Sequence, residues 1–323
     1  MTMAARDTIA IVGAGLMGHG IAQVFAVAGH PVRVYDAHRP ALDTLHDRIR
    51  GNLDQLGIPG GAEARVTAHA DLAEAVAGAA VVFEAAPEKL DLKRALFADL
   101  MKLAAPDTLL ASNTSVIPIG EIASGLETRE RIVGTHWWNP PFLVPLVEVV
   151  ATGQTAASSV DRMIDLLSSV GKQPVRVKKD VPGFVGNRLQ HALWREAIAI
   201  VAEGIADAET VDTVVKASFG RRLAVLGPLE NADLVGTDLT LDIHNVVLGH
   251  LDRSPGPSPY LASLVRDGRL GMKSGEGFRH WLPDEAQALR GKVFSYLRNF
   301  DQSQKLSGGD HGDATVQTGG PAA

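Results

Sequence analysis

Residues 8–18, Thr-Ile-Ala-Ile-Val-Gly-Ala-Gly-Leu-Met-Gly, decide the fold of the N-terminal half of the chain. A short apolar run that ends in glycine is typical of a buried parallel strand. The glycines that follow have the spacing G-x-G-x-x-G at the start of a predicted helix. This spacing permits a tight turn and lets the backbone approach a pyrophosphate. We therefore expect a dinucleotide-binding turn made by Gly13, Gly15, Leu16, Met17 and Gly18.

The acid that follows the second predicted strand indicates which dinucleotide binds. Residues 32–35 form that strand, and Asp36 ends it. A carboxylate at this place accepts hydrogen bonds from the ribose hydroxyls of NAD and repels the 2′-phosphate of NADP. We predict NAD as the cofactor, although the cation Arg39 lies close by and keeps NADP as an alternative.

Strands and helices alternate along the rest of the first half. Further strands are predicted at residues 66–67, 80–83, 108–111, 131–134, 146–149 and 175–177, and helices at about 40–56, 88–104 and 156–170. Such alternation predicts an α/β domain with a Rossmann-like, doubly wound parallel sheet over residues 1–182.

The pattern becomes purely helical after residue 182. Apolar residues recur at helical spacing from residue 189, a helix is predicted from Asp207 to about residue 216, and a long one covers about 231–249. We expect a smaller all-α domain over residues 183–300, to which the family resemblance described below assigns substrate binding and dimer formation. Residues 301–323 are rich in small polar residues and are predicted to be a flexible tail.

The composition excludes several functional classes. With 323 residues, the chain is long enough for two domains. A net charge of −6 argues against a nucleic-acid partner, and no apolar run is long enough to cross a membrane. The chain has no cysteine, which excludes thiolate chemistry and fits a cytoplasmic location. Its histidines show no metal-binding spacing, so we predict no metal site.

A histidine and a glutamate supply the candidate chemistry. His136 lies in Thr-His-Trp-Trp-Asn-Pro-Pro, residues 135–141, and Glu148 follows twelve residues later in an apolar strand. Histidine is the side chain best suited to proton transfer near neutral pH, and a carboxylate can fix its tautomer. Beside a dinucleotide site, the pair predicts coupled proton and hydride transfer. The alternatives are a packed histidine at position 136 and a solvent-facing side chain at position 148.

Seven motifs in this order resemble the L-3-hydroxyacyl-CoA dehydrogenase family over residues 8–282. They are GAGLMGHGIA with the acid Asp36, EAAPEKLDLK, ASNTS, GTHWWNPP, LVEVV, DVPGFVGNR and LGMKSGEGF. The resemblance implies an NAD-dependent enzyme that interconverts a 3-hydroxyacyl substrate and its 3-oxo form. It also implies a homodimer, made through the helical domain, and a place in fatty-acid metabolism.

The resemblance assigns further roles to single residues. His136 would remove the hydroxyl proton, and Glu148 would hold the imidazole. Ser115 and Asn187 would bind the substrate, with Ser115 also touching the cofactor. The other cofactor contacts would be Glu88, Lys93, Asn139 and Lys273. From the residues alone, Ser115 and Asn187 are equally suited to capping helices.

Two departures bear on the substrate. Members of the family that use coenzyme A thioesters carry a longer, lysine-rich hairpin after the second strand, whereas residues 57–65 are short, rich in glycine and almost without cations. With tryptophans at positions 137 and 138, the chain resembles relatives that oxidise carnitine or gulonate. The substrate is therefore a 3-hydroxyacyl-CoA or a smaller 3-hydroxy acid. An enzyme for aldehydes or imines and a non-catalytic NAD-binding protein, structural or regulatory, remain as alternatives.

Overall fold

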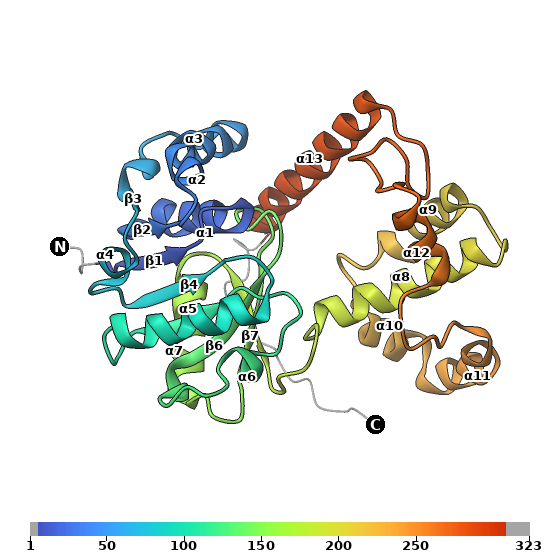
Figure 1. The fold of residues 1–323 in the computed structure, drawn as a ribbon. Coiled ribbons are helices and arrows are strands. Elements are labelled where there is room, and N and C mark those ends of the chain that lie inside the picture. The colour runs from blue at the N-terminus through green and yellow to red at the C-terminus, as the bar shows by residue number, and fades with distance from the viewer. Residues whose placement is uncertain (1–5, 308–323) are drawn as a thin grey trace, which may run out of the picture. The chain divides into compact units, whose positions relative to one another are not determined.

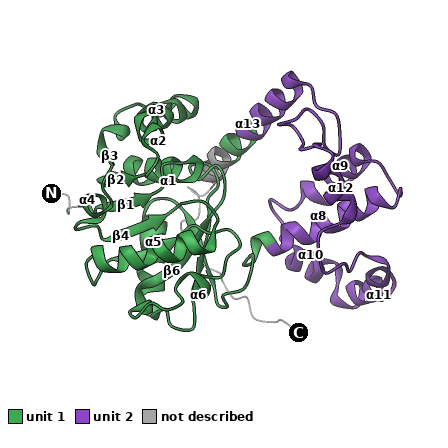
Figure 2. Ribbon diagram, viewed as in Figure 1, with its two compact units in different colours: residues 1–187, 295–323 green, residues 188–294 purple. Residues whose placement is uncertain are grey.

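The structure, a computed structural model, describes residues 6–307, which form two compact units (Figures 1 and 2). Unit 2 contains residues 188–294, and unit 1 contains the residues before and after this range. The sequence predicts a boundary after residue 182, five residues before the division between these units. The segment 183–187 belongs to unit 1, where it is bonded to the sheet domain.

Unit 1 is built on one eight-stranded sheet, in the order β3-β2-β1-β4-β5-β6-β7-β8. The strands are β1 (Ile9–Val12), β2 (Val32–Tyr35), β3 (Val66–His69), β4 (Val81–Glu84), β5 (Leu109–Ser112), β6 (Ile132–Trp137), β7 (Leu146–Val150) and β8 (Gln173–Val177). All neighbouring strands are parallel except β6 and β7, which are antiparallel. The predicted doubly wound, largely parallel sheet is confirmed.

Helices cover both faces of this sheet. They are α1 (Leu16–Val27), α2 (Arg39–Asp43), α3 (Leu45–Leu56), α4 (Leu72–Val76), α5 (Leu90–Leu103), α6 (Ile119–Ile122) and α7 (Ala157–Ser169), with 3-10 turns η1 (Ala62–Arg65) and η2 (Arg129–Arg131). Alternate residues of β1 supply the two cores, because strand side chains point to opposite faces. Ile9 and Ile11 pack with residues of α1, α3 and α7, whereas Ala10 and Val12 pack with residues of α4, α5 and α6.

Unit 2 is helical, as predicted. Its helices are α8 (Gly186–Ala202), which starts in unit 1, α9 (Ala208–Ala217), α10 (Pro228–Val235), α11 (Thr237–Val247), α12 (Pro259–Arg266) and the first part of α13 (Pro283–Ser307), with η3 (Phe219–Arg221) and η4 (Leu248–His250). Within residues 188–294 there are isolated bridges at Glu276 but no strand. Asp207 caps α9 by accepting a bond from the Thr210 amide.

Three predicted segments differ from the structure. The helix expected over residues 40–56 is divided at Thr44, and the one expected over 231–249 is divided at Gly236, whose φ of 99° ends a helix. Residues 301–307 continue α13, so the expected flexible tail does not start at residue 301. Residues 308–323 of that tail lie outside the described residues. No helix within 6–307 has the length and apolarity to span a bilayer.

Candidate active site

The two predicted catalytic groups meet on adjacent strands. His136 on β6 is directly opposite Glu148 on β7 in the antiparallel register, which places both side chains on one face. His136 Nδ1 lies 2.7 Å from Glu148 Oε2, and the side chains are 4 % and 0 % exposed. The alternative in which Glu148 faces solvent is therefore wrong.

Both oxygens of the Glu148 carboxylate have partners. The amides of Val185 and Gly186 donate to Oε1 over 2.9 and 3.0 Å, while Oε2 faces His136. Burial favours the neutral acid, but the bonds from His136 and from the two amides outweigh it and hold the pKa of Glu148 below its usual range. Glu148 is therefore an anion when it holds the imidazole.

Aromatic rings surround His136. The ring of Trp138 lies 5.1 Å from the imidazole between centroids, and the ring of Phe184 lies 5.9 Å away. Nε2 of His136 has no hydrogen-bond partner among the described residues. With Nδ1 donating to the anionic carboxylate, Nε2 keeps its lone pair and can accept a proton.

Ser115 and Asn187 are brought together in unit 1. Ser115 lies beyond the carboxyl end of β5, and its carbonyl oxygen accepts a 2.8 Å bond from the Asn187 side-chain amide. Neither residue is an N-cap: α6 begins after Pro118 with no side-chain cap, and Asn187 lies inside α8, which begins at Gly186. This position, outside a strand end, is where ligands bind in doubly wound sheets.

A buried charge network holds the Ser115 turn. The Lys93 ammonium is 2.7 Å from Glu84 Oε1 and 3.4 Å from Glu88 Oε2, and its side chain is 1 % exposed. Glu88 in turn accepts bonds from the Thr114 hydroxyl and from the Ser115 amide. Despite burial, these bonds and the Lys93 charge hold the pKa of Glu88 below its usual range.

This network changes the interpretation of Lys93 and adds residues that the sequence analysis missed. Lys93 was expected to contact the cofactor, but the structure gives its ammonium three oxygen partners inside the protein. Glu84 and Ser112, joined by a 2.6 Å bond, were not anticipated. The available signal was Glu84 itself, an acid that ends the apolar strand β4, because a buried carboxylate needs partners.

The fingerprint glycines lie in a tight turn at the start of α1. Gly13 has a φ of 105°, and a Cβ there would lie 2.6 Å from the Ala85 carbonyl oxygen. A Cβ on Gly18 would lie 1.7 Å from the Gly13 oxygen. Nothing lies within 4 Å of a Cβ on Gly15, the N-cap of α1, so the space before the helix N-terminus is open to a pyrophosphate.

The other residues predicted to bind the cofactor differ in their contacts. Asp36 accepts bonds from the amides of Ala14 (2.6 Å) and His38 (2.7 Å), which fix its carboxylate beside the fingerprint turn. Arg39 is engaged by Asp43 over 3.1 Å. Asn139 is exposed after β6, and Lys273 belongs to unit 2, so the cofactor contacts expected of these two residues stay predictions.

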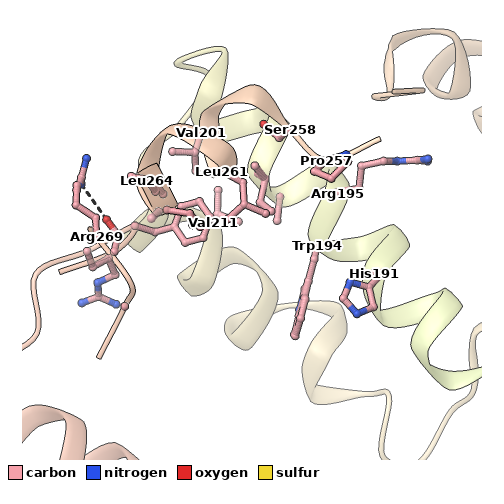
Figure 3. A pocket seen from close by; sticks show the side chains of 18 of the residues that line it. His191, Trp194, Arg195, Val201, Val211, Pro257, Ser258, Leu261, Leu264 and Arg269 are labelled. Carbon is pink, nitrogen blue, oxygen red and sulfur yellow. Dashed lines mark hydrogen bonds between the residues drawn. The ribbon is translucent and has the colours of Figure 1, made fainter. Parts of the chain in front are cut away.

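Unit 2 contains an apolar groove of its own. It is lined by α8, α9 and α12, with side chains that include Trp194, Val201, Val211, Leu261, Leu264 and Arg269 (Figure 3). Leu264 and Ala286 are the only fully buried apolar side chains between residues 188 and 294. The helical unit therefore has almost no core of its own.

Two family models match nearly the whole described chain. Residues 8–181 match the model described as 3-hydroxyacyl-CoA dehydrogenase, NAD binding domain, and residues 183–281 match the model of the C-terminal domain. Helix α13 lies beyond both matches.

Individual relatives differ in what they act on. The chain is 37 % identical to the 5-formyl-3-hydroxy-2-methylpyridine 4-carboxylate 5-dehydrogenase of Mesorhizobium japonicum, with 87 % of this chain and 93 % of the relative covered. It is 40 % identical to an L-carnitine dehydrogenase of Streptomyces griseus, over 71 % and 69 % of the two chains. A crystal structure of a 5-dehydrogenase of that pyridine type, described as an NAD⁺-dependent dismutase, superimposes with a TM-score of 0.86, 35 % identity and coverage of 93 % and 99 %.

Proposed function

Because the chain belongs to the 3-hydroxyacyl-CoA dehydrogenase family and is an NAD-dependent oxidoreductase, we propose that it oxidises or reduces a small hydroxy acid or aldehyde with His136 and Glu148 as its catalytic dyad. The observation that carries this proposal is the 2.7 Å bond between two buried side chains on adjacent strands. A buried ionisable pair with an available ring nitrogen is suited to proton transfer.

The proton moves through His136. When bound, NAD would supply the acceptor for the hydride that leaves the substrate carbon. His136 Nε2 takes the proton of the substrate hydroxyl, so that the C–O bond becomes a carbonyl and no alkoxide accumulates. Glu148 fixes the tautomer that leaves Nε2 free and stabilises the imidazolium that forms. In the reverse direction the same proton returns to the substrate oxygen.

Ser115 and Asn187 orient the substrate in this scheme. Ser115 is partly exposed, and its amide and carbonyl are both fixed, by Glu88 and by Asn187. Its hydroxyl is thus held in a defined place, from which we expect it to bond the reacting oxygen. The fingerprint residues Gly13, Gly15, Leu16, Met17 and Gly18 hold the pyrophosphate, and Asp36 holds the ribose.

The segment after α3 favours a small substrate over a thioester. Helix α3 ends at Leu56, Gly57 turns the chain with a φ of 68°, and residues 57–65 contain one cation, Arg65. Glu63 there bonds the Gly61 amide and Arg50. Recognition of the phosphates of coenzyme A relies largely on cations, and this segment has only one. The pyridine dehydrogenase relative supports the same preference.

Aldehydes fit the dyad as well as alcohols do. A hydrated aldehyde presents the same H–C–O–H unit, so loss of hydride to NAD and of a proton to His136 gives a carboxylic acid. The similarity to a structure described as a dismutase supports testing both directions on one aldehyde.

The test is a substrate panel with the purified enzyme. NADH consumption is measured with acetoacetyl-CoA, dehydrocarnitine and a cyclic imine, and product acid and alcohol are both measured with a formylpyridine carboxylate. We expect turnover with a small carboxylate-bearing substrate. Activity with acetoacetyl-CoA alone would establish the thioester function that the family description names. NAD binding without any turnover would favour the non-catalytic alternative.

We also propose a homodimer formed by unit 2, in the cytoplasm. Helices α8, α9, α10 and α11 have no buried residue, although many of their side chains are apolar. A helical unit of this size needs a packed core to be stable, and a second copy supplies the missing apolar surface. The lack of cysteine fits a reducing compartment.

A further inference from the structure

The turn before α8 has an unusual backbone. Gly183 has a φ of 74° and Phe184 a φ of 48°, and Phe184 is the only non-glycine residue with a positive φ in the described chain. A side chain with a Cβ rarely adopts this left-handed conformation, because the Cβ approaches the backbone oxygen. Such residues persist where the surrounding structure holds them, often at functional sites.

The two left-handed residues aim the next two amides at one atom. The N–H groups of Val185 and Gly186 both donate to Glu148 Oε1, over 2.9 and 3.0 Å. Consecutive amides that converge in this way form an anion-binding nest. Because α8 begins at Gly186, the positive end of a long helix faces the same carboxylate.

Packing fixes the turn in this conformation. The Phe184 side chain is 1 % exposed, and it packs in the core beneath α5 and α6 as well as near His136. The Gly183 amide donates to the Val116 carbonyl, and the Phe184 amide donates to the Val181 carbonyl. The burial of one ring thus offsets the cost of one strained backbone.

We propose that Phe184 is a positioning residue: its buried ring and left-handed backbone hold residues 183–186 as a nest that keeps Glu148 ionised and aligned on His136. The inference rests on the proposed dyad. His136 is the titratable side chain bonded to Glu148 among the described residues, and the neighbouring strand β8 places apolar Val175 beside it.

Two substitutions separate the ring from the backbone. Phe184→Gly removes the ring but adopts a positive φ freely, whereas Phe184→Ala removes the ring and leaves a residue that prefers other conformations. We expect Phe184→Ala to lower kcat/KM by about 10–100-fold, the usual effect of losing a group that orients a reacting one. The acid limb of its pH profile shifts, because a disordered nest changes the charge that Glu148 presents to His136. Phe184→Gly keeps the acid limb in place and loses less activity.

The control for general core damage is Phe97→Ala. Phe97 is a fully buried ring in the same core cluster, on α5. Its loss lowers the melting temperature but leaves the acid limb unmoved.

A second measurement tests whether Phe184 acts through Glu148. Phe184→Ala is combined with Glu148→Gln, and we expect the double variant to be no slower than Glu148→Gln alone. The positioning role would be overturned if the activity losses of the two single variants multiply in the double variant. It would also be overturned if Phe184→Ala and Phe184→Gly shift the acid limb equally. If Glu148→Gln is as active as the wild type, the proposed dyad is refuted, and the positioning role of Phe184 is refuted with it.

Discussion

Glu148 is stable inside the protein only because hydrogen bonds replace the water that it has lost. Its two oxygens receive three donors in total, from His136, Val185 and Gly186. Removal of water would otherwise favour the neutral acid, which could not hold an imidazolium. The same bonds that make burial tolerable therefore also supply the charge that catalysis needs.

The first prediction concerns the proton acceptor. We expect His136→Gln to lower kcat by about 10²–10⁴-fold, the range for loss of a general base. The fingerprint turn is made by other residues, so the dissociation constant of NAD should stay within about threefold. Steady-state kinetics and fluorescence titration with NADH measure the two quantities. A variant that loses NAD binding as severely as turnover would contradict this division of roles.

The second prediction concerns pH and stability. The pKa of Glu148 is lower in the folded protein than its ordinary value of 4.5, so its ionised form stabilises the fold. This contribution is fully present above about pH 4.5 and is lost as the pH falls through the lower, folded-state pKa. We expect Glu148→Gln to be less stable than the wild type by about 1–3 kcal/mol at pH 7. Urea unfolding should show the same gap in unfolding free energy at pH 7 and pH 5, and a smaller gap at pH 4 and below.

At the scale of elements, the carboxyl ends of β4 and β5 are joined through buried charge. Glu84 and Ser112 are neighbours in the parallel register, and Lys93 from α5 reaches both Glu84 and Glu88. Removing one member of a buried ion pair costs more than removing both, because an unpaired charge remains. The network thus locks the Ser115 turn to the sheet.

The third prediction tests whether the buried network holds this turn in place. We expect Lys93→Met to destabilise the protein by about 3–5 kcal/mol through the unpaired Glu84. Adding Glu84→Gln should restore part of the melting temperature, measured by calorimetry. Since Lys93 contacts protein oxygens, kcat should fall more than the affinity for NAD. A raised KM for NAD with unchanged kcat would instead support the cofactor contact that the family resemblance implies.

At this scale, the sequence predicts local structural features well. The tight turn at the fingerprint glycines, the Asp207 cap and most strands follow from patterns within about ten residues, and the structure contains them. The antiparallel β6–β7 pair, which turns Glu148 toward His136, depends on pairing between strands that periodicity does not specify. The left-handed Phe184 is unforeseen for the same reason, because tertiary packing overrides its preference.

Some predicted helix boundaries were wrong because the effect of a small residue on the helix was not predicted. Gly236 divides the helix expected over residues 231–249, and nothing in the apolar spacing on either side indicates the break. A glycine within a helical pattern is often tolerated, so its effect depends on the φ that the surroundings impose. The network around Lys93 was missed because a lysine on an amphipathic helix is usually solvated.

At the scale of the whole molecule, the two units differ in how they are stabilised. Unit 1 has two continuous cores on either side of its sheet. Unit 2 leaves large apolar side chains exposed, among them Leu229 at 79 %, Leu234 at 73 % and Leu241 at 61 %. Exposed apolar area on this scale marks an interface in a protein that is stable in water. This difference in exposed apolar surface supports placing the proposed dimer contact in unit 2.

The last prediction follows from that asymmetry. We expect Leu234→Asp combined with Leu241→Asp to convert the proposed dimer to a monomer, because a carboxylate at either position would be buried unpaired in the proposed interface. Light scattering after gel filtration should show the mass falling from twice the chain mass of 34.1 kDa to that value, with a lower melting temperature. Leu103→Asp is the matched control, since this leucine is 42 % exposed at the end of α5 in unit 1. A wild type that is monomeric at micromolar concentration would refute the dimer, and loss of the dimer in the control would show that any added charge suffices.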